Sequence, residues 1–283
     1  MEKLLLVTYL PFNRIHEIKK YFDLSVKAAQ PDEVMIFIDN VVDGFQKELL
    51  KEKIGYKIMT GNWGSRVLTW ISILEEFEKF EGRMLVVDSD NVLDTGIGEI
   101  ARSWKETFLT FMDWEDYVNG SRGIMPRSKK IGELEFGTQK RPLYRFSVYN
   151  GSLFGSGATF FIGPKQSVLM TRKLDKDLLN RLKKSVEQLP KSLLKHISDE
   201  TLLAVIAYLM GLKEVCWTVG TKHYHSKPES MDNVQLKLMK SVNALAHERL
   251  ADALYKEFRI KEFRTYRRKY MLARLKNALY SIF

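Results

Sequence analysis

Two acidic residues, one position apart, follow a short apolar stretch in the first third of the chain. Met84 to Val87 are apolar, and Asp88 and Asp90 come next with Ser89 between them. Residues i and i+2 of an extended chain point the same way, so both carboxylates would face one spot. Carboxylate oxygens suit Mg²⁺ or Mn²⁺, and such an ion would bind a diphosphate group. A turn that ends a strand is the alternative explanation, because Asp and Ser are common there.

A regular alternation of apolar and amphipathic stretches leads up to this acidic pair. Apolar stretches typical of buried strands alternate with stretches whose apolar residues recur every three or four positions, as in helices. The expected strands are residues 4–9, 34–38, 56–59 and 83–87, and the expected helices are 14–29, 45–53 and 66–80. This order predicts an α/β domain in which helices flank a mostly parallel central sheet.

The same order predicts which polar residues meet. Right-handed crossovers bring the C-terminal ends of parallel strands to one edge, where open α/β sheets bind ligands. The polar residues that end the expected strands are Thr8, Tyr9, Asp39, Asn40, Asp88 and Asp90. The pattern therefore predicts a nucleotide site at this edge of the sheet.

The second half of the chain is less regular. Residues 109–149 are rich in Trp, Tyr, Arg and Gly, which indicates short antiparallel strands and a mobile loop. Further strands are expected over 158–162 and 215–219. Ser198 precedes Asp199 and Glu200, a combination typical of a helix start, and the helix would run to about residue 209. The chain from residue 233 onward has neither proline nor glycine and is expected to be helical.

Composition limits the class of protein. The single cysteine, Cys216, excludes an intrachain disulfide, and the longest apolar stretch, residues 202–212, is too short to cross a bilayer. A formal net charge of +10 favours anionic partners, namely nucleotide phosphates, nucleic acid or acidic lipid. These features predict a cytoplasmic protein, and the 283 residues leave room for one large domain or two small ones.

With these segments in order, residues 3–228 resemble the nucleotide-sugar glycosyltransferases of the GT-A fold. Asp88-Ser89-Asp90 matches the Asp-x-Asp motif of that superfamily, and the flanking pattern is nearest to the glycogenin and lipopolysaccharide galactosyltransferase group. The segments similar to that group are 85–93, 154–157, 199–202 and 223–228. Glu200 replaces the group's usual glutamine. Because Asp199-Glu200 also resembles the base of inverting transferases, retention and inversion both stay open.

The resemblance implies a metal-dependent enzyme that moves a sugar from a UDP- or GDP-linked donor to a hydroxyl of a glycan or lipid-linked acceptor. The cofactor would be Mn²⁺ or Mg²⁺. Residues 1–228 would form one catalytic domain, with a nucleotide-binding half over 1–93 and an acceptor half over 94–228. Residues 229–283 would form a helical extension.

The resemblance also implies roles for single residues. The metal ligands would be Asp88, Asp90 and a late histidine, for which His225 is slightly preferred over His223. The donor would contact Thr8, Tyr9, Asp39, Asn62, Arg66, Asp88 and Lys227, with Asp39 on the nucleobase. Asp199 or Glu200 would face the acceptor and remove its proton in an inverting enzyme, or bind sugar hydroxyls in a retaining one. Helix capping alone is the alternative explanation for this acidic pair.

Residues 251–283 are basic, with aromatic and aliphatic residues interleaved among nine lysines and arginines. A basic amphipathic helix is typical of a segment that binds a membrane surface, which would suit a peripheral enzyme on the inner membrane face. Packing on the catalytic domain is the alternative, and it is favoured for 233–258.

Two other functions compete with glycosyl transfer. A nucleotidyltransferase would pair Gly-Ser with Asp-x-Asp, but Gly64-Ser65 lies a full helix before Asp88. A non-enzymatic protein could bind nucleic acid with its basic C-terminal helix. We do not expect this partner, because no recognised nucleic-acid module is present.

Overall fold

The computed structural model describes residues 2–40, 54–118, 128–150, 159–160, 166–224 and 233–279. Its strands are β1 (Leu4–Pro11), β2 (Glu33–Asp39), β3 (Lys57–Gly61), β4 (Arg83–Val87), β5 (Asn91–Leu93), β6 (Phe108–Asp113), β7 (Ser128–Phe136), β8 (Gln139–Ser147), β9 (Tyr149–Asn150), β10 (Thr159–Phe160), β11 (Ser167–Met170) and β12 (Glu214–His223). Ten of them form one sheet in the order β3-β2-β1-β4-β11-β6-β12-β8-β7, with β5 paired to β12, while β9 and β10 pair separately.

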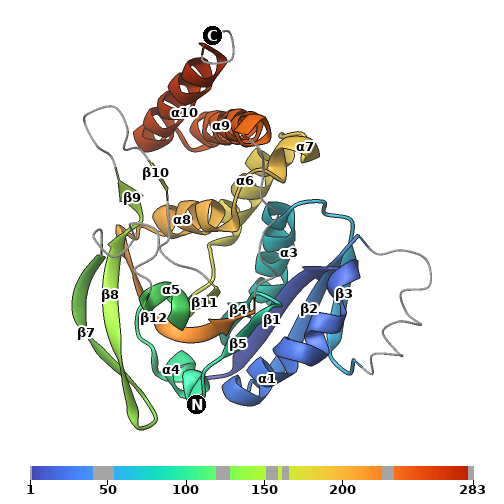
Figure 1. Cartoon of the computed structure of the whole chain (residues 1–283), viewed down its shortest axis with the longest axis vertical. Helices are drawn as coiled ribbons and strands as arrows, with labels where there is room; N and C mark the ends of the chain where they lie inside the picture. Colours follow the sequence, from blue (N-terminus) through green and yellow to red (C-terminus); the bar gives the residue numbers. More distant parts are fainter. Residues whose placement is uncertain are drawn as a thin grey trace.

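The helices follow the strands in most connections (Figure 1). They are α1 (Asp23–Ala29), α3 (Arg66–Lys79), α4 (Ile97–Ser103), α5 (Trp114–Val118), α6 (Lys176–Glu187), α7 (Lys191–Leu194), α8 (Asp199–Leu209), α9 (Asn233–Phe258) and α10 (Lys261–Leu279). The helix expected over 14–29 is divided into a 3-10 turn (Phe12–Arg14), a π-helical turn (Ile18–Phe22) and α1. The helix expected over 45–53 lies outside the described residues.

The sheet is mostly parallel, so the predicted α/β class is confirmed. β1 pairs in parallel with both β2 and β4, and β2 pairs in parallel with β3. β11 then lies antiparallel between β4 and β6, which restores the common direction in β6 and in its parallel partner β12. The antiparallel strands β8 and β7 complete the far edge.

Strict alternation in β1 explains why the sheet has a core on each face. Leu5 and Val7 belong to the core that also contains α3, α6 and α8 residues, whereas Leu4 and Leu6 belong to the core against α1 and α4. Successive side chains of a strand point to opposite faces, so each strand contributes to both layers. Every residue of β1 from Leu4 to Leu10 is buried.

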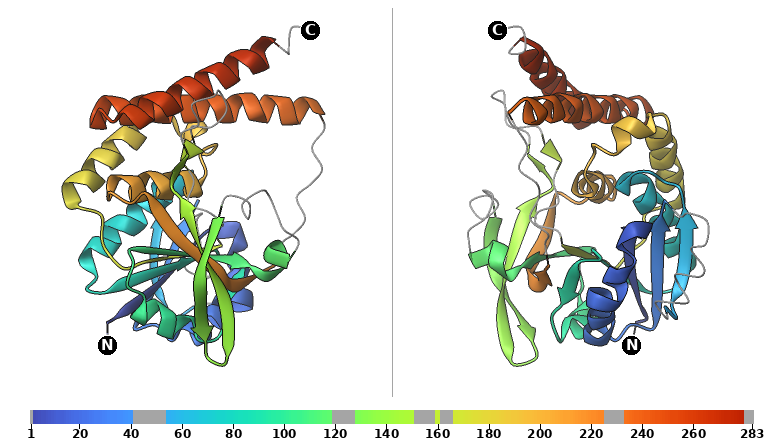
Figure 2. Two further views of the ribbon diagram at one scale, coloured as in Figure 1. Left: turned by 90° about the vertical axis from the view of Figure 1, so that its left-hand side faces the viewer. Right: turned by 45° about the vertical axis from the view of Figure 1, so that its right-hand side comes forward.

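The C-terminal helices share the first of these cores. α9 packs on α6 and α7, α10 packs along α9, and both lie across one end of the molecule (Figure 2). Leu250, Leu254, Phe263 and Tyr266 are fully buried in the core formed by α3, α6 and α8. Among the described helices, none has the length and apolar character needed to cross a membrane.

Candidate active site

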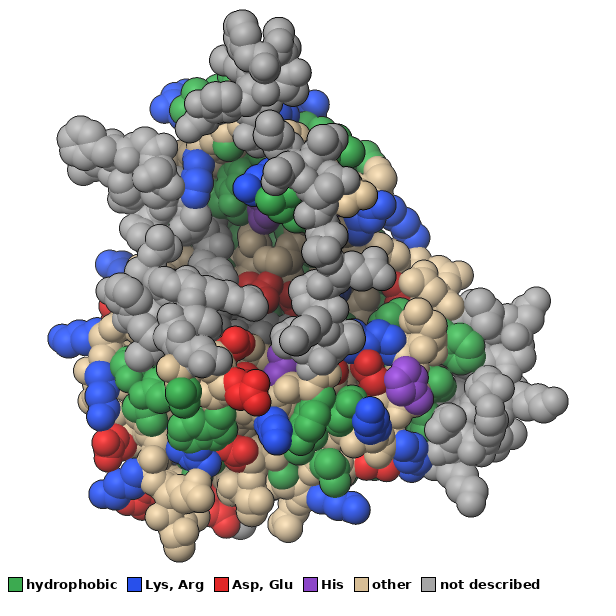
Figure 3. Space-filling model, viewed as in Figure 1, with side chains coloured by type: hydrophobic (Ala, Val, Ile, Leu, Met, Phe, Trp, Pro, Cys, Tyr) green, Lys and Arg blue, Asp and Glu red, His purple; other side chains and the backbone are tan. Residues whose placement is uncertain are grey.

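The C-terminal ends of β1, β2 and β4 meet as the sequence pattern predicts. Their pairing aligns Tyr9 with Phe37, Pro11 with Asp39, and Val7 with Val86. A cavity of about 1000 Å³ opens beyond these ends. The charged side chains that line it are Arg14, Asp39, Arg66, Asp88, Asp90, Asp116, Lys195, Asp199, Glu200 and His223. In the space-filling view, acidic side chains are visible in the hollow below the C-terminal helices (Figure 3).

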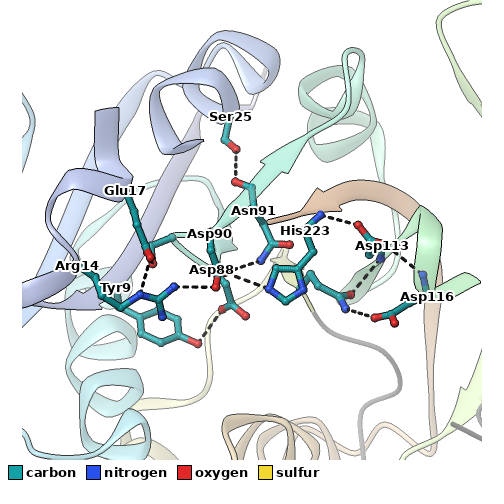
Figure 4. Close-up of polar contacts among 12 residues, drawn as sticks. Tyr9, Arg14, Glu17, Ser25, Asp88, Asp90, Asn91, Asp113, Asp116 and His223 are labelled. Carbon is teal, nitrogen blue, oxygen red and sulfur yellow. Dashed lines mark hydrogen bonds and ion pairs between the residues drawn. The ribbon is translucent and has the colours of Figure 1, made fainter. Parts of the chain in front are cut away.

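Each carboxylate oxygen of Asp90 lies close to a side-chain nitrogen of Arg14 or His223 (Figure 4). Arg14 Nη2 lies 2.7 Å from Asp90 Oδ2, and His223 Nε2 lies 3.4 Å from Asp90 Oδ1. Asn91 Nδ2 also donates to Oδ1, at 3.2 Å. Burial alone would raise the pKa of Asp90, but hydrogen bonds and charge from His223 and Arg14 outweigh burial and hold that pKa well below its ordinary value.

His223 reaches the acidic pair because β12 pairs with β5. The register aligns His223 with Asn91, the residue after Asp90, and Tyr224 N donates to the Asp90 carbonyl oxygen at 2.9 Å. The His223 backbone N donates to Asp113 Oδ2 at 2.5 Å. Burial lowers the pKa of the His223 ring, but the hydrogen bond and charge of Asp90 raise it above its ordinary value. His225 and Lys227, both predicted to contact the donor or its metal, lie outside the described residues.

Tyr9 connects the two acidic segments of the site. Its hydroxyl lies 2.8 Å from Asp88 Oδ1 and 2.5 Å from Asp199 Oδ2. A hydroxyl has one hydrogen, so it cannot donate fully to two ionised carboxylates at once. The Tyr9 hydroxyl therefore links Asp88 and Asp199 through one shared donor. Asp199 comes from the start of α8, and Asp88 from the end of β4.

Burial distinguishes the two acidic residues at the start of α8. Asp199 is fully buried, and its Oδ2 also accepts a hydrogen bond from Trp70 Nε1 at 3.3 Å. Arg66 Nη1 lies 3.8 Å from Asp199 Oδ1. Glu200 is only partly buried and lines the cavity. Ser198 caps the helix by accepting from Thr201 N, so neither carboxylate is needed as the cap.

Two residues predicted to bind the donor, Thr8 and Asn62, lie outside the cavity, whereas Asp39 lines it. Thr8 is fully buried on the opposite face of β1 from Tyr9 and does not line the cavity, because side chains alternate along a strand. Asn62 lies outside the cavity, and its carbonyl oxygen accepts from Lys191 Nζ. The Asp39 carboxylate accepts from the backbone N–H groups of Trp63 and Gly64, at 2.7 Å and 3.0 Å, so it holds the loop before α3.

Sequence analysis missed several residues that line the cavity. Arg14 follows β1, Gln166 precedes β11, and Met239 and Asn243 come from α9. Arg14 could have been found as a basic residue close after a strand end, but no spacing rule distinguishes it from a surface arginine. The α9 residues had no sequence signal, because only tertiary packing brings that helix to the cavity.

The donor set suits a divalent cation in chemical type. Asp88 and Asp90 supply two carboxylates and His223 supplies an imidazole to one cavity. Mn²⁺ and Mg²⁺ favour carboxylate oxygens as ligands. These side chains are not yet arranged as ligands, because Asp90 is paired with Arg14 and Asp88 accepts from Tyr9. Within the described part of the chain, no group of three or more His, Cys, Asp or Glu side chains has metal-binding geometry.

Solved structures similar to this chain include S. aureus TarS 1-349, with 12% identity, a TM-score of 0.49, and coverage of 97% of this chain and 72% of that one. The galactosyltransferase LgtC, solved with donor and acceptor sugar analogs, has 12% identity and a TM-score of 0.42, with 85% and 95% covered. The mannosyltransferase PcManGT from Pyrobaculum calidifontis, solved with GDP-Man and Mn²⁺, has 10% identity and a TM-score of 0.46, with 98% and 73% covered. No protein-family model and no curated protein matches the sequence. At such TM-scores a likeness does not establish function, which has to be argued from the cavity itself.

Proposed function

We propose that the chain is a GT-A-type glycosyltransferase that moves a hexose from a UDP- or GDP-linked donor to a hydroxyl of a glycan or lipid-linked acceptor. One observation carries this proposal. Asp88 and Asp90 from the segment after β4, Arg14 from the segment after β1, and Glu200 from α8 surround a single cavity at the strand ends. The cavity thus combines groups for a diphosphate with a carboxylate that can accept a proton.

The donor's diphosphate would bind at the β1 and β4 end of the cavity. Arg14 and Arg66 both line it, and a guanidinium binds phosphate oxygens through two parallel hydrogen bonds. Asp88, Asp90 and His223 would hold Mn²⁺ or Mg²⁺, which supplies Lewis-acid stabilisation of the diphosphate that departs when the glycosidic bond breaks. Acidic side chains outnumber arginines in the cavity lining, so a bound divalent cation would offset part of their negative charge.

The acceptor would enter on the α8 side. Asp199 and Glu200 both line the cavity there, and Glu200 is the less buried of the two, so it is our candidate for removing the acceptor's hydroxyl proton. Asp199 is fully buried and bonded to Tyr9 and Trp70, so it would position Tyr9 and Asp88 instead. This assignment makes the enzyme inverting.

A thermal-shift screen tests the donor assignment. UDP, GDP, ADP and CMP compounds are added with and without Mn²⁺, and we expect a Mn²⁺-dependent rise in melting temperature with UDP or GDP, because ligands that bind only the folded state stabilise it. The matched variant Asp90→Asn should lose this rise and should lose sugar transfer measured by release of the nucleoside diphosphate. An unchanged Mn²⁺-dependent shift and unchanged turnover in Asp90→Asn would refute the metal assignment.

A further inference from the structure

Arg14 connects two acidic groups beside the cavity, the buried Glu17 and the half-buried Asp90. Its Nε donates to Glu17 Oε1 at 2.6 Å, and its Nη2 donates to Asp90 Oδ2 at 2.7 Å. Glu17 is 7% exposed, and its other oxygen accepts from Ser89 Oγ at 2.6 Å. The Arg14 guanidinium is therefore fixed between Glu17 and Asp90 (Figure 4).

In this position Arg14 is paired with Asp90, the carboxylate that a divalent cation would also need as a ligand. The guanidinium and a metal ion on Asp90 would both be positive and only a few ångström apart, and like charges at that distance repel strongly where water is partly excluded. A metal ion that binds through Asp90 Oδ2 must therefore displace Nη2 of Arg14. Wild-type affinity for the ion alone is lowered by the free energy of that exchange.

Arg14 has a second binding partner available once it leaves Asp90. Its side chain is 34% exposed and lines the cavity. Because the guanidinium is planar and rigid, a change in the torsions of the aliphatic part of the side chain would move all of its nitrogens together, toward the space next to the acidic pair. A diphosphate bound there would receive the hydrogen bonds that Asp90 gives up, and guanidinium groups match phosphate geometry well.

We propose that Arg14 is an exchangeable counter-ion of Asp90: it holds the carboxylate before a divalent cation binds and then contacts the nucleoside diphosphate. This inference rests on the proposed function, because it assumes that Asp90 is a metal ligand. It predicts that the metal and the nucleotide bind cooperatively, since each removes the cost of moving Arg14 for the other.

Arg14→Met tests the exchange with two binding measurements that need no turnover. Mn²⁺ binding without nucleotide is measured by electron paramagnetic resonance of the free ion, and UDP or GDP binding by calorimetry at saturating Mn²⁺. We expect Arg14→Met to bind Mn²⁺ roughly tenfold more tightly and the nucleoside diphosphate roughly tenfold more weakly, as expected for one charged hydrogen bond in each state. A purely structural role would weaken both.

Two further variants keep the test decisive. Arg14→Met with Glu17→Gln removes the buried charge together with its partner, and it replaces the single variant if that one does not fold. Arg102→Met is the matched control, because Arg102 pairs with Asp32 away from the cavity, and it should change neither affinity. Equal Mn²⁺ affinity in Arg14→Met and wild type overturns the exchange alone. Absence of Mn²⁺ binding in both, up to millimolar concentration, overturns the proposed metal site and the exchange with it.

Discussion

At the scale of single residues, contacts with Tyr9 and burial distinguish the proposed base from the residue that positions the site. The Tyr9 hydroxyl contacts Asp88 and Asp199 within hydrogen-bond distance, so it links the end of β4 to the start of α8. Asp199 is fully buried, and its Oδ2 already contacts Tyr9 and Trp70. Glu200, one residue later on the helix, is only partly buried and lines the cavity.

Replacement of the two acidic residues separates the base from the positioning residue. We expect Glu200→Gln to lower kcat for sugar transfer by about 10²–10⁴-fold while the KM for the donor changes little, because proton transfer is lost and binding is not. Asp199→Asn keeps the shape of the side chain and should raise the donor KM more than it lowers kcat. Steady-state kinetics of transfer and of donor hydrolysis measure both. A larger kcat loss in Asp199→Asn than in Glu200→Gln would contradict this division.

At the scale of elements, the site depends on strand pairing and helix starts rather than on loops alone. β5 and β12 pair so that His223 lies beside Asp90, and Ser25 Oγ fixes β5 by bonding Asn91 O and Leu93 N, each at 3.0 Å. The pairing of α9 and α10 is equally specific. His247 on α9 lies 2.8 Å from the Tyr266 hydroxyl on α10 and stacks on Tyr270.

This helix pair should make stability depend on pH. Burial, and to a lesser extent the charge of Lys269, lower the pKa of His247 to about 4. The ring is therefore neutral in the folded state, whereas in the unfolded state it titrates near its ordinary pKa of about 6.5. The stability that this difference contributes is present above pH 6.5 and is lost as the pH falls through 4, with an upper limit of about 3 kcal/mol.

Thermal unfolding between pH 7 and pH 4 measures the effect. His247→Gln cannot titrate, so its melting temperature should fall less steeply with decreasing pH than that of the wild type. His16→Gln is the matched control, because His16 is exposed, and it should follow the wild-type slope. Parallel curves for His247→Gln and wild type would contradict the assignment.

At the scale of the whole molecule, α10 has a buried face and an exposed one. Phe263 and Tyr266 are buried in the main core, whereas Lys261, Arg264, Arg268, Leu272 and Leu275 are exposed. Their spacing of three and four residues places these five side chains, which we call the α10 stripe, on one face of the helix. We propose that the α10 stripe binds an anionic membrane surface, with its arginines at the head groups and its leucines below them.

The buried residues determine how this proposal has to be tested. Deletion of residues 259–283 would remove Phe263 and Tyr266 from the core and destabilise the fold, so substitutions are required. We expect Arg264→Glu with Arg268→Glu to reduce binding to vesicles containing anionic lipid by roughly tenfold or more in sedimentation assays, at about 1 kcal/mol per basic residue. The melting temperature should stay close to that of the wild type.

A charge-matched control distinguishes a specific surface from net charge. Lys129 and Lys140 lie exposed on the β7–β8 hairpin, whose turn lies at the opposite end of the molecule from α10 (Figure 1). Lys129→Glu with Lys140→Glu changes the net charge by the same amount and should leave vesicle binding nearly unchanged. Equal losses in both double variants would show that only overall charge matters.

The sequence alone determined the features that depend on near neighbours along the chain. Apolar stretches and helical spacing located β1, β2, β4, α3 and α8, because strand and helix periodicities are local. The Asp88–Asp90 pair and its place at a strand end followed from the same pattern. The common direction of most strands in the sheet confirmed the α/β class, although β11, α6 and α7 were not predicted.

Tertiary structure decided everything that depends on distant partners. Side-chain alternation placed Tyr9 in the cavity and Thr8 in the opposite core, and the Asp39 carboxylate was found on loop backbone groups. Arg14 meets Asp90, His223 meets the same carboxylate, and Tyr9 meets Asp199 across separations of 76, 133 and 190 positions. No periodicity encodes such contacts, because they arise from strand order, register and the packing of α8 and α9 over the sheet edge.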